Sequence, residues 1–217
     1  MSLRSFAGMA VTFVIAFTTI ATTSPSASAA SVSPATDACF AEYTGDNATD
    51  FSSPDASALR NALAAVAPGG TVKVAGTCAG VILDGGTTQV ARVTKAITLI
   101  GGYAPADWAV SDPLIQPATI DAQAGGRGVF FSGVDGNVAN ITIQNGNELT
   151  GHGGGIYATG ALSMTRVGIL NSVAQLAGGG AFATDAVTVN EGLFERNRAV
   201  TYDGGGLYGN SSVTLAG

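Results

Sequence analysis

Three copies of one glycine-rich motif decide how this chain folds: Gly153-Gly154-Gly155-Ile156-Tyr157, Gly178-Gly179-Gly180-Ala181-Phe182 and Gly204-Gly205-Gly206-Leu207-Tyr208. The three copies follow one another at a nearly constant spacing. Two apolar positions follow each copy at the same offsets, and they are Leu162, Val187 and Val213, then Met164, Val189 and Leu215. A short repeat of this kind indicates a solenoid in which each copy forms one turn.

The period predicts the fold class. A unit of this size that holds short strands and no helix cannot bury an apolar face alone, so successive units must stack. In a parallel stack with strands about 4.8 Å apart, Val187 would lie between Leu162 and Val213 inside the coil. We therefore predict an all-β, right-handed parallel β-helix, a single-stranded solenoid of about 25 residues per turn with one N-terminal capping helix. A β-propeller would need blades of roughly 40–50 residues.

Polar and aromatic residues recur with the same period. Asn145, Asn171 and Asn197 are evenly spaced along the chain, and we expect an internal ladder in which each amide bonds to the next turn. Another column, at a fixed offset from the glycines, contains Tyr157, Phe182 and Tyr208. We expect these rings to stack inside the coil. The alternative is an outward column that could stack on sugars. The glycines suit corners with positive φ, or places where turns pass closely.

The first residues are typical of an export signal. Arg4 precedes an apolar stretch over residues 6–20, and Ala27-Ser28-Ala29 is an A-x-A cleavage site. We predict a signal peptide over residues 1–29 and a flexible leader over 30–38. The apolar stretch is too short for a bilayer-spanning helix, which needs about 20 residues. The mature protein is therefore expected outside the cell or at the cell surface, without inserting into the membrane.

An N-terminal cap is predicted over residues 39–70, with a helix over 55–67. Ser53 is a plausible N-cap, Pro54 fits the first helical position, and Asp55 suits the positive end of the helix dipole. The apolar stripe of this helix is Leu59, Ala62, Leu63 and Val66. Residues 71–217 are expected to form the turns of the β-helix. Because the chain stops partway through a repeat, we expect it to be truncated, with further turns and an anchoring segment missing.

Cys39 and Cys78 are the two cysteines of the chain. An even count in an exported protein favours one disulfide between them. The bond would close a loop of about 40 residues and contribute about 4 kcal/mol in the chain-entropy account. Two buried free thiols are the alternative.

Two resemblances support this fold. Phe194-Glu195-Arg196-Asn197, followed by Gly204-Gly205-Gly206-Leu207, resembles the repeat of chlamydial polymorphic outer-membrane proteins. The stretch from Ala75 to Ala122, with Cys78, Gly101-Gly102-Tyr103 and Trp108, looks like the first turns of exported β-helix proteins of the pectate-lyase-like superfamily. The resemblance implies that a helix caps the open N-terminal end. This superfamily includes lyases, hydrolases, adhesins and passenger domains, so the fold does not decide the function.

Charge narrows the choice of partners. The chain carries a net charge of −6 and only 11% charged residues. Removal of Arg4 with the signal peptide makes the mature charge −7 (8 basic and 15 acidic residues). Such a surface repels nucleic acid and anionic membranes. A surface glycan or another cell-surface protein is the expected partner.

No convincing catalytic group is evident from the sequence. His152, in Gly151-His152-Gly153, is a weak catalytic candidate, because polygalacturonases of this fold carry a Gly-His-Gly motif beside paired aspartates. No Asp-Asp pair occurs here, and we expect His152 to be a solvent-exposed turn residue. We predict no metal site and no cofactor, with Ca²⁺ needed only if the chain is a lyase. The expected role is a structural, adhesive or passenger-like surface module; the alternative is a pectate lyase-like or polygalacturonase-like enzyme, or an inactive relative.

Overall fold

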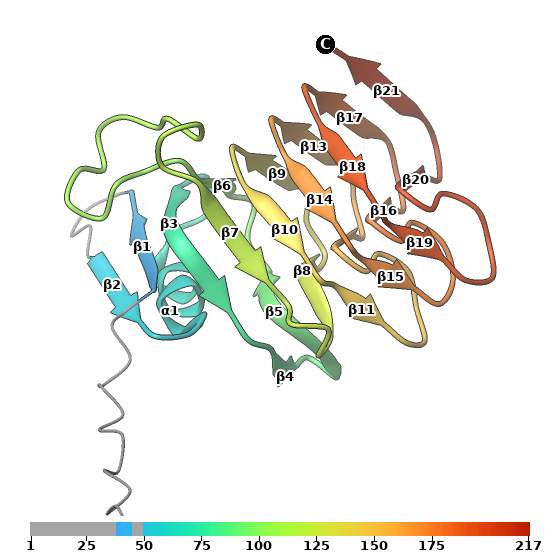
Figure 1. The fold of residues 1–217 in the computed structure, drawn as a ribbon, viewed down its shortest axis with the longest axis horizontal. Helices are drawn as coiled ribbons and strands as arrows, with labels where there is room; N and C mark the ends of the chain where they lie inside the picture. The colour runs from blue at the N-terminus through green and yellow to red at the C-terminus, as the bar shows by residue number, and fades with distance from the viewer. Residues whose placement is uncertain (1–37, 45–49) are drawn as a thin grey trace, which may run out of the picture. The chain divides into compact units, whose positions relative to one another are not determined.

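The computed structural model describes residues 38–44 and 50–217. The predicted signal peptide, and the predicted leader up to residue 37, lie outside the described residues. The described part contains 21 β-strands and one α-helix, and the strands stack turn after turn along one axis (Figure 1). The predicted all-β parallel β-helix is confirmed.

One side of the coil is a stack of six strands, one from each turn. Neighbouring strands in this stack pair in parallel. In order along the axis they are β3 (Thr71–Ala79), β6 (Thr98–Ile100), β9 (Gly136–Ala139), β13 (Leu162–Thr165), β17 (Val187–Asn190) and β21 (Val213–Ala216). Leu162 pairs with Val187, which pairs with Val213. The predicted column is therefore confirmed.

The long first strand starts a second stack as well. Residues 71–73 of β3 pair with β6, whereas residues 76–79 pair with β7. The second stack continues from β3 through β7 (Ala118–Asp121), β10 (Thr142–Gln144), β14 (Gly168–Leu170) and β18 (Leu193–Glu195). The second to fifth turns therefore each have two short strands where the first turn has one, and a corner separates them.

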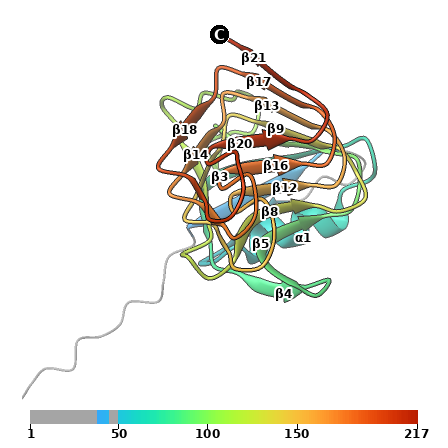
Figure 2. The same cartoon turned by 90° about the vertical axis from the view of Figure 1, so that its right-hand side faces the viewer.

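Two smaller sheets close the coil. The six-stranded sheet contains β4 (Ile82–Asp84), β5 (Thr87–Val93), β8 (Arg127–Phe131), β12 (Ile156–Ala158), β16 (Ala181–Ala183) and β20 (Leu207–Gly209). The three-stranded sheet contains β11 (Asn147–Glu148), β15 (Val173–Ala174) and β19 (Arg198–Ala199). Figure 2 shows β8, β12, β16 and β20 stacked above one another.

Columns of aliphatic side chains fill the coil. Ile120, Ile143 and Ile169 stack on β7, β10 and β14, and all three are fully buried. Met164, Val189 and Leu215 form a neighbouring column, as predicted. Burying one such side chain contributes about 1.5–3 kcal/mol, so the stack itself is the main source of stability.

The glycine triplets meet both expected needs. Gly153, Gly178 and Gly204, the first of each triplet, have φ of +65°, +64° and +74°. Residues that carry a Cβ rarely adopt this left-handed backbone conformation. The third glycine allows close passage: a Cβ on Gly155 would lie 2.6 Å from the carbonyl oxygen of Gly180 in the next turn. Any larger residue there would push two turns apart.

A hairpin and a helix cover the N-terminal end of the coil. β1 (Cys39–Tyr43) pairs antiparallel with β2 (Asp50–Ser53) and with β3, so it protects the outer edge of the first turn. The predicted disulfide is confirmed, since Cys39 and Cys78 join β1 to β3 with a Cα–Cα distance of 4.5 Å. The apolar stripe of α1 (Ser57–Ala65) packs into the same core as the strands.

The helix is shorter than predicted. It begins at Ser57, not at residue 55, because Pro54 and Asp55 form a turn in which the Asp55 carboxylate accepts a hydrogen bond from the Ser57 N–H (2.7 Å). Ser53 ends β2 and is not the N-cap residue, although its hydroxyl accepts from the Ala58 N–H (2.9 Å). The helix ends at Ala65, where Lys95 donates to the carbonyl of Ala64 (2.7 Å). No helix in the described part of the chain is long and apolar enough to cross a membrane.

Candidate ligand groove

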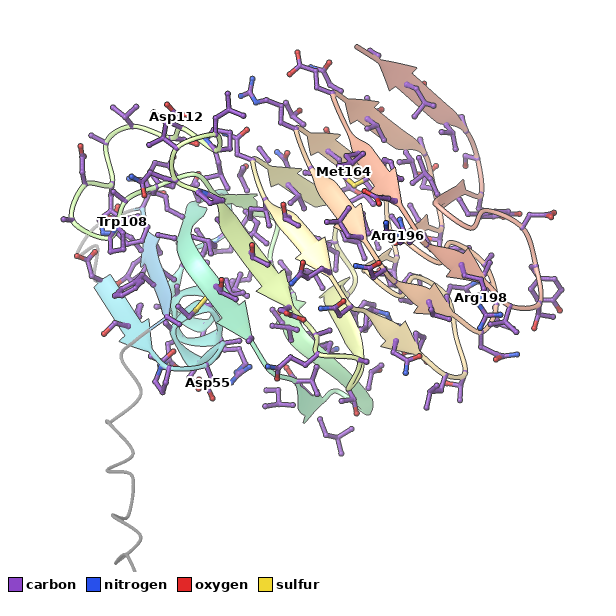
Figure 3. All side chains as sticks on the ribbon, viewed as in Figure 1. Asp55, Trp108, Asp112, Met164, Arg196 and Arg198 are labelled. Atoms are coloured by element: carbon purple, nitrogen blue, oxygen red, sulfur yellow. A yellow bond between two sulfur atoms is a disulfide. The ribbon has the colours of Figure 1, made fainter. Side chains whose placement is uncertain are left out.

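One corner of the coil carries an insertion. In the third, fourth and fifth turns the corner between the two stacks is crossed by residues 140–141, 166–167 and 191–192. In the second turn the same corner is occupied by residues 101–117, between β6 and β7. Figure 3 labels Trp108 and Asp112 on this loop. Figures 1 and 3 show the loop projecting from the coil beside β6 and β7.

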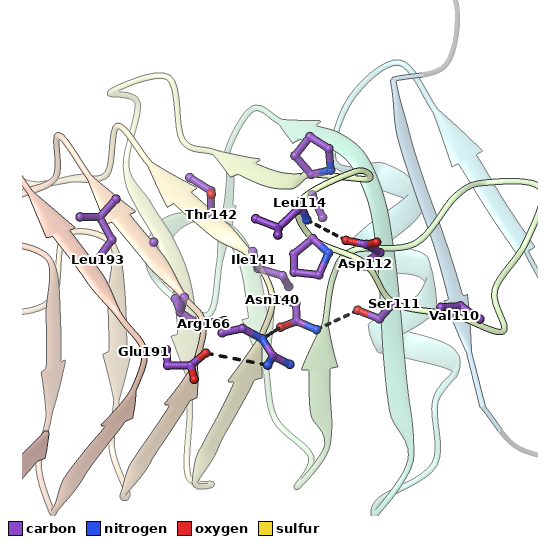
Figure 4. A pocket seen from close by; sticks show the side chains of 15 residues that line it. Val110, Ser111, Asp112, Leu114, Asn140, Ile141, Thr142, Arg166, Glu191 and Leu193 are labelled. Carbon is purple, nitrogen blue, oxygen red and sulfur yellow. Dashed lines mark hydrogen bonds and ion pairs between the residues drawn. The ribbon is translucent and has the colours of Figure 1, made fainter. Parts of the chain in front are cut away.

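The loop forms one wall of a groove of about 750 Å³ (Figure 4). The corners of the next three turns form its floor. The residues that line the groove are Val110, Ser111, Asp112, Pro113, Leu114, Pro117, Ala118, Asn140, Ile141, Thr142, Arg166, Val167, Gly168, Glu191 and Leu193. Its size lies within the range of about 300–1,000 Å³ that is usual for ligand sites.

Polar side chains form one column along the floor. Asn140, Arg166 and Glu191 follow one another at the same corner of successive turns, and all three have positive φ (56°, 51° and 57°). Arg166 Nε donates to Asn140 Oδ1 (2.8 Å), and Arg166 Nη1 lies 3.9 Å from Glu191 Oε2. The column is therefore internally paired, and both ends of the ion pair stay half exposed.

Hydrogen bonds hold the loop against this column. Asn140 Nδ2 donates to Ser111 Oγ (2.8 Å), and the Ser111 hydroxyl donates to the Gly101 carbonyl (2.6 Å). Asp112 Oδ1 accepts from the N–H of Leu114 (3.1 Å). Lys73 Nζ donates to the Trp108 carbonyl (2.7 Å) from the neighbouring strand β3. The loop wall is thus tied to the coil at several points.

The repeat pattern did not predict this groove. Paired residues of the later turns, such as Leu162 and Val187, follow the regular period, whereas Ile100 of β6 pairs with Ala139 of β9 after a much longer step. That excess of chain at one step is the signal that could have located the insertion.

His152, the weak catalytic candidate, lies away from the groove and between two turns. Its Nδ1 accepts a hydrogen bond from the Ala177 N–H (3.2 Å), and its ring centroid lies 4.2 Å from that of Phe182. Burial, and then the charge of Arg127, lower the pKa of His152 below 6.5. The expectation of a solvent-exposed histidine is therefore wrong, because the ring is half-buried and packs against Phe182.

A buried ion pair lies beside His152. Arg127 Nη2 lies 2.9 Å from Glu148 Oε2, with side chains only 4% and 9% exposed. Arg127 also donates to the carbonyls of Gly153 (2.8 Å) and His152 (2.9 Å), while Glu148 Oε1 accepts from the Thr150 N–H (3.1 Å). Burial lowers the pKa of Arg127, and the Glu148 carboxylate opposes that effect. These polar contacts hold the loop between β11 and β12.

The aromatic column faces outward, so the expectation of an inward stack is wrong. Tyr157 lies between the buried Ile156 and Ala158 on β12, and alternate residues of a strand point to opposite faces. Its ring stacks on Phe130 at 5.1 Å, and Phe182 stacks on Tyr208 at 5.3 Å. Phe182 is only 6% exposed. In each of these two pairs, the ring faces that stack on each other are not open to a sugar.

The predicted asparagine ladder is right for the alignment of Asn145 with Asn171, one position after the paired Gln144 and Leu170, but wrong for Asn197. Leu170 pairs with Glu195, so one position further Asn171 lies opposite Arg196, and Asn197 falls one position out of the column. This turn is one residue shorter than the spacing of the asparagines requires. Asn197 instead aligns with Ser172, whose N–H donates to Asn197 Oδ1 (2.9 Å). The Nδ2 group of Asn145 donates to Asp121 Oδ1 (2.9 Å), and Asn171 is exposed.

Acidic residues are dispersed. Within residues 38–44 and 50–217, no group of three or more His, Cys, Asp or Glu side chains is placed to hold a metal ion. Burial raises the pKa of the Asp121 carboxyl, but hydrogen bonds from Asn145, the Gln123 backbone and Gln144 outweigh it, so this pKa lies below 3.8. Asp121 is therefore an ionised acceptor for its neighbours.

Comparison with other proteins does not add to this picture. Comparing the chain with models of protein families, with curated proteins and with solved structures finds no match in any of the three. The groove and its residues must therefore be judged on their own chemistry.

Proposed function

We propose that this chain is an exported β-helix module with an adhesive or passenger-like role at the cell surface, and that it binds a surface partner in the corner groove. The observation that carries the proposal is the groove itself. There a hydrogen-bonded loop holds exposed aliphatic side chains over a rigid floor. Binding sites are commonly loops positioned by a rigid scaffold.

Other features support export. The Cys39–Cys78 bond is of a kind that persists in oxidising compartments. The residues predicted as a signal peptide, 1–29, have the charge, apolar stretch and cleavage site that export requires. An acidic surface favours proteins or neutral glycans over nucleic acid as partners.

Membership of the pectate-lyase-like superfamily, and kinship with chlamydial polymorphic outer-membrane proteins, are finer proposals. The coil with its N-terminal helix supports the first, and the glycine corners support the second. Neither resemblance assigns a substrate. A polysaccharide-active enzyme, with Ca²⁺ if it were a lyase, is the alternative that this fold allows.

Adhesion and catalysis can be separated with purified mature protein. Beads coated with the protein should be retained on intact cells, and the double variant Leu114→Ser/Leu193→Ser should lose most of that retention. Ile115→Ser is the matched control, because Ile115 is an exposed aliphatic residue of the same loop that does not line the groove.

The same preparations should be assayed against polyuronides and neutral glycans, with and without Ca²⁺. Turnover that disappears in His152→Ala would replace the adhesive proposal with the enzyme. Retention on cells that is equal for the groove variant and the wild type would remove the groove from the proposal.

A further inference from the structure

We infer that the corner groove takes an extended segment of a partner polypeptide that alternates aliphatic and basic side chains. This inference rests on the proposed function and names the class of ligand for that groove. Its evidence is the apolar wall, the pairing of the polar atoms, the excess of carboxylates and the direction of the groove.

The wall of the groove is aliphatic and unusually exposed. Leu114 is 94% exposed and Val110 is 66% exposed, both on the inserted loop. Leu193, from β18 in the fifth turn, is 56% exposed and lines the same groove. Clustered apolar side chains at a hollow mark an interaction site, whereas scattered single ones do not. Leu193 and the loop residues come from distant parts of the chain, so the groove is a product of the fold.

The chemistry of the lining favours a polypeptide over a glycan. The lining residues include no aromatic ring, and the proline rings and aliphatic side chains match aliphatic side chains of a ligand. Two of the polar side chains are already used within the protein, since Ser111 bonds to Gly101 and Asn140 accepts from Arg166. A sugar would bring many hydroxyl groups that need partners when they are desolvated.

The charges of the groove favour a cation. Asp112 and Glu191 line it with one guanidinium, that of Arg166. Arg166 donates its Nε–H to Asn140, and its Nη1 lies 3.9 Å from Glu191 Oε2 with both side chains about half exposed, so the Glu191 carboxylate stays open to a second cation. One carboxylate remains in excess, in a chain whose net charge is −6. An acidic segment would be repelled by the groove and by the rest of the surface.

The direction of the groove favours an extended ligand. Asn140, Arg166 and Glu191 lie at one corner of three successive turns, so this polar column runs along the coil axis (Figure 4). Leu114 of the loop and Leu193 lie together on one side of this column (Figure 4). An extended chain presents alternate side chains to opposite sides. It could therefore place aliphatic groups against Leu114 and basic groups beside Glu191.

Three synthetic peptides of equal length test this directly: alternating Leu-Lys, alternating Leu-Glu and alternating Ser-Lys. Binding to the mature disulfide-bonded protein is measured by fluorescence anisotropy. We expect the Leu-Lys peptide to bind at least about tenfold more tightly than the other two. Leu114→Ser and Glu191→Gln should each weaken it several-fold, and Ile115→Ser should leave it unchanged.

Each result has a distinct meaning. Equal or tighter binding of the Leu-Glu peptide, lost in Leu114→Ser, would overturn the basic ligand while the groove remained a binding site. Binding of Leu-Lys that is insensitive to Leu114→Ser would overturn the groove as its site. If no peptide binds while a neutral glycan binds in a Leu114-dependent manner, the inference of a polypeptide ligand is wrong and the proposed adhesive function stands. If nothing binds and the beads are not retained on cells, both fail.

Discussion

The second and fourth turns of the coil connect their two strands across the same corner with segments of very different length. In the fourth turn Arg166 and Val167 alone lead from β13 to β14. In the second turn residues 101–117 lie between β6 and β7. The flanking strands nevertheless keep their register, because Ile100 still pairs with Ala139 and Ala118 still pairs with Gly76.

This difference shows that the stacked strands determine the fold, whereas the corners can form a binding site. Each strand is positioned by the strands above and below it, so the length of a corner has little influence on the stack. Closing a longer loop costs only about 0.6 kcal/mol for each doubling of its length. Corners can therefore vary to build a site while the inward columns hold the fold.

The largest effect should come from the part that both turns share. Ile169 of the fourth turn is fully buried in a column with Ile143. Ile169→Asp would place a carboxylate with no partner in that column, and we expect a loss of about 5 kcal/mol or more, enough to prevent folding. Circular dichroism and urea unfolding would measure it. Ser163→Asp, on the exposed side of β13, is the control and should change stability by no more than about 0.5 kcal/mol. A soluble, cooperatively folded Ile169→Asp protein would contradict the importance of the columns.

The inward columns could be predicted because their spacing follows directly from the stack. Leu162, Val187 and Val213 fall into register as the glycine repeat requires. The asparagine column was predicted correctly for Asn145 and Asn171 but not for Asn197, because one turn has one residue fewer and a period alone does not show where a turn is shorter. The predicted inward direction of the aromatic rings was wrong for another reason. A side chain changes face with each residue, so a constant offset predicts a column but not whether Tyr157 points in or out.

The groove could not be predicted from the repeats at all. Its wall comes from an insertion at a corner that the next three turns cross with two residues each, and its floor joins those three corners. Asn140, Arg166 and Glu191 are different residue types in successive turns, so no recurring residue marks their column. Only the long steps from Ile100 to Ala139 and from Gly76 to Ala118 point to that corner.

Loss of the disulfide should have the next largest effect. The bond joins β1 to β3, which pairs with both strands that flank the inserted loop. The sequence separation of Cys39 and Cys78 is 39, and closing a loop of this size is worth about 4 kcal/mol of unfolded-state entropy. The double variant Cys39→Ser/Cys78→Ser should unfold at correspondingly lower denaturant. An unchanged midpoint would mean that the N-terminal hairpin adds little to the coil.

A smaller effect should follow the titration of His152, which ties the third turn to the fourth outside the groove. Burial, then Arg127, lower its pKa below 6.5 in the folded chain. The unfolded chain therefore binds the proton first as pH falls. Stability should be complete above about pH 6.5 and should decline from there down to the lowered native pKa, by at most about 1.4 kcal/mol per pH unit.

Denaturant midpoints between about pH 7 and pH 5 would measure this slope. His152→Gln removes the titrating group and should flatten it. The carboxyls with shifted pKa, Asp55 and Asp121, titrate below 3.8 and so leave this window clear. A slope that is the same in His152→Gln would show that the Ala177–His152 contact does not sense pH.

The smallest change in stability should come from converting the second turn into a copy of the third. Replacing residues 101–117 by Asn-Ile, the pair that crosses the corner as Asn140 and Ile141, shortens the loop and lowers its closure entropy. The replacement also removes the contact of Lys73 with the Trp108 carbonyl and the packing of the buried Tyr103. Because these effects are of similar size and oppose each other, we expect the free energy of unfolding to change by less than about 1 kcal/mol. Binding in the groove should disappear, since one wall is gone. A shortened protein that fails to fold would show that the inserted loop is part of the scaffold, and corners of this coil could then not be regarded as free to vary.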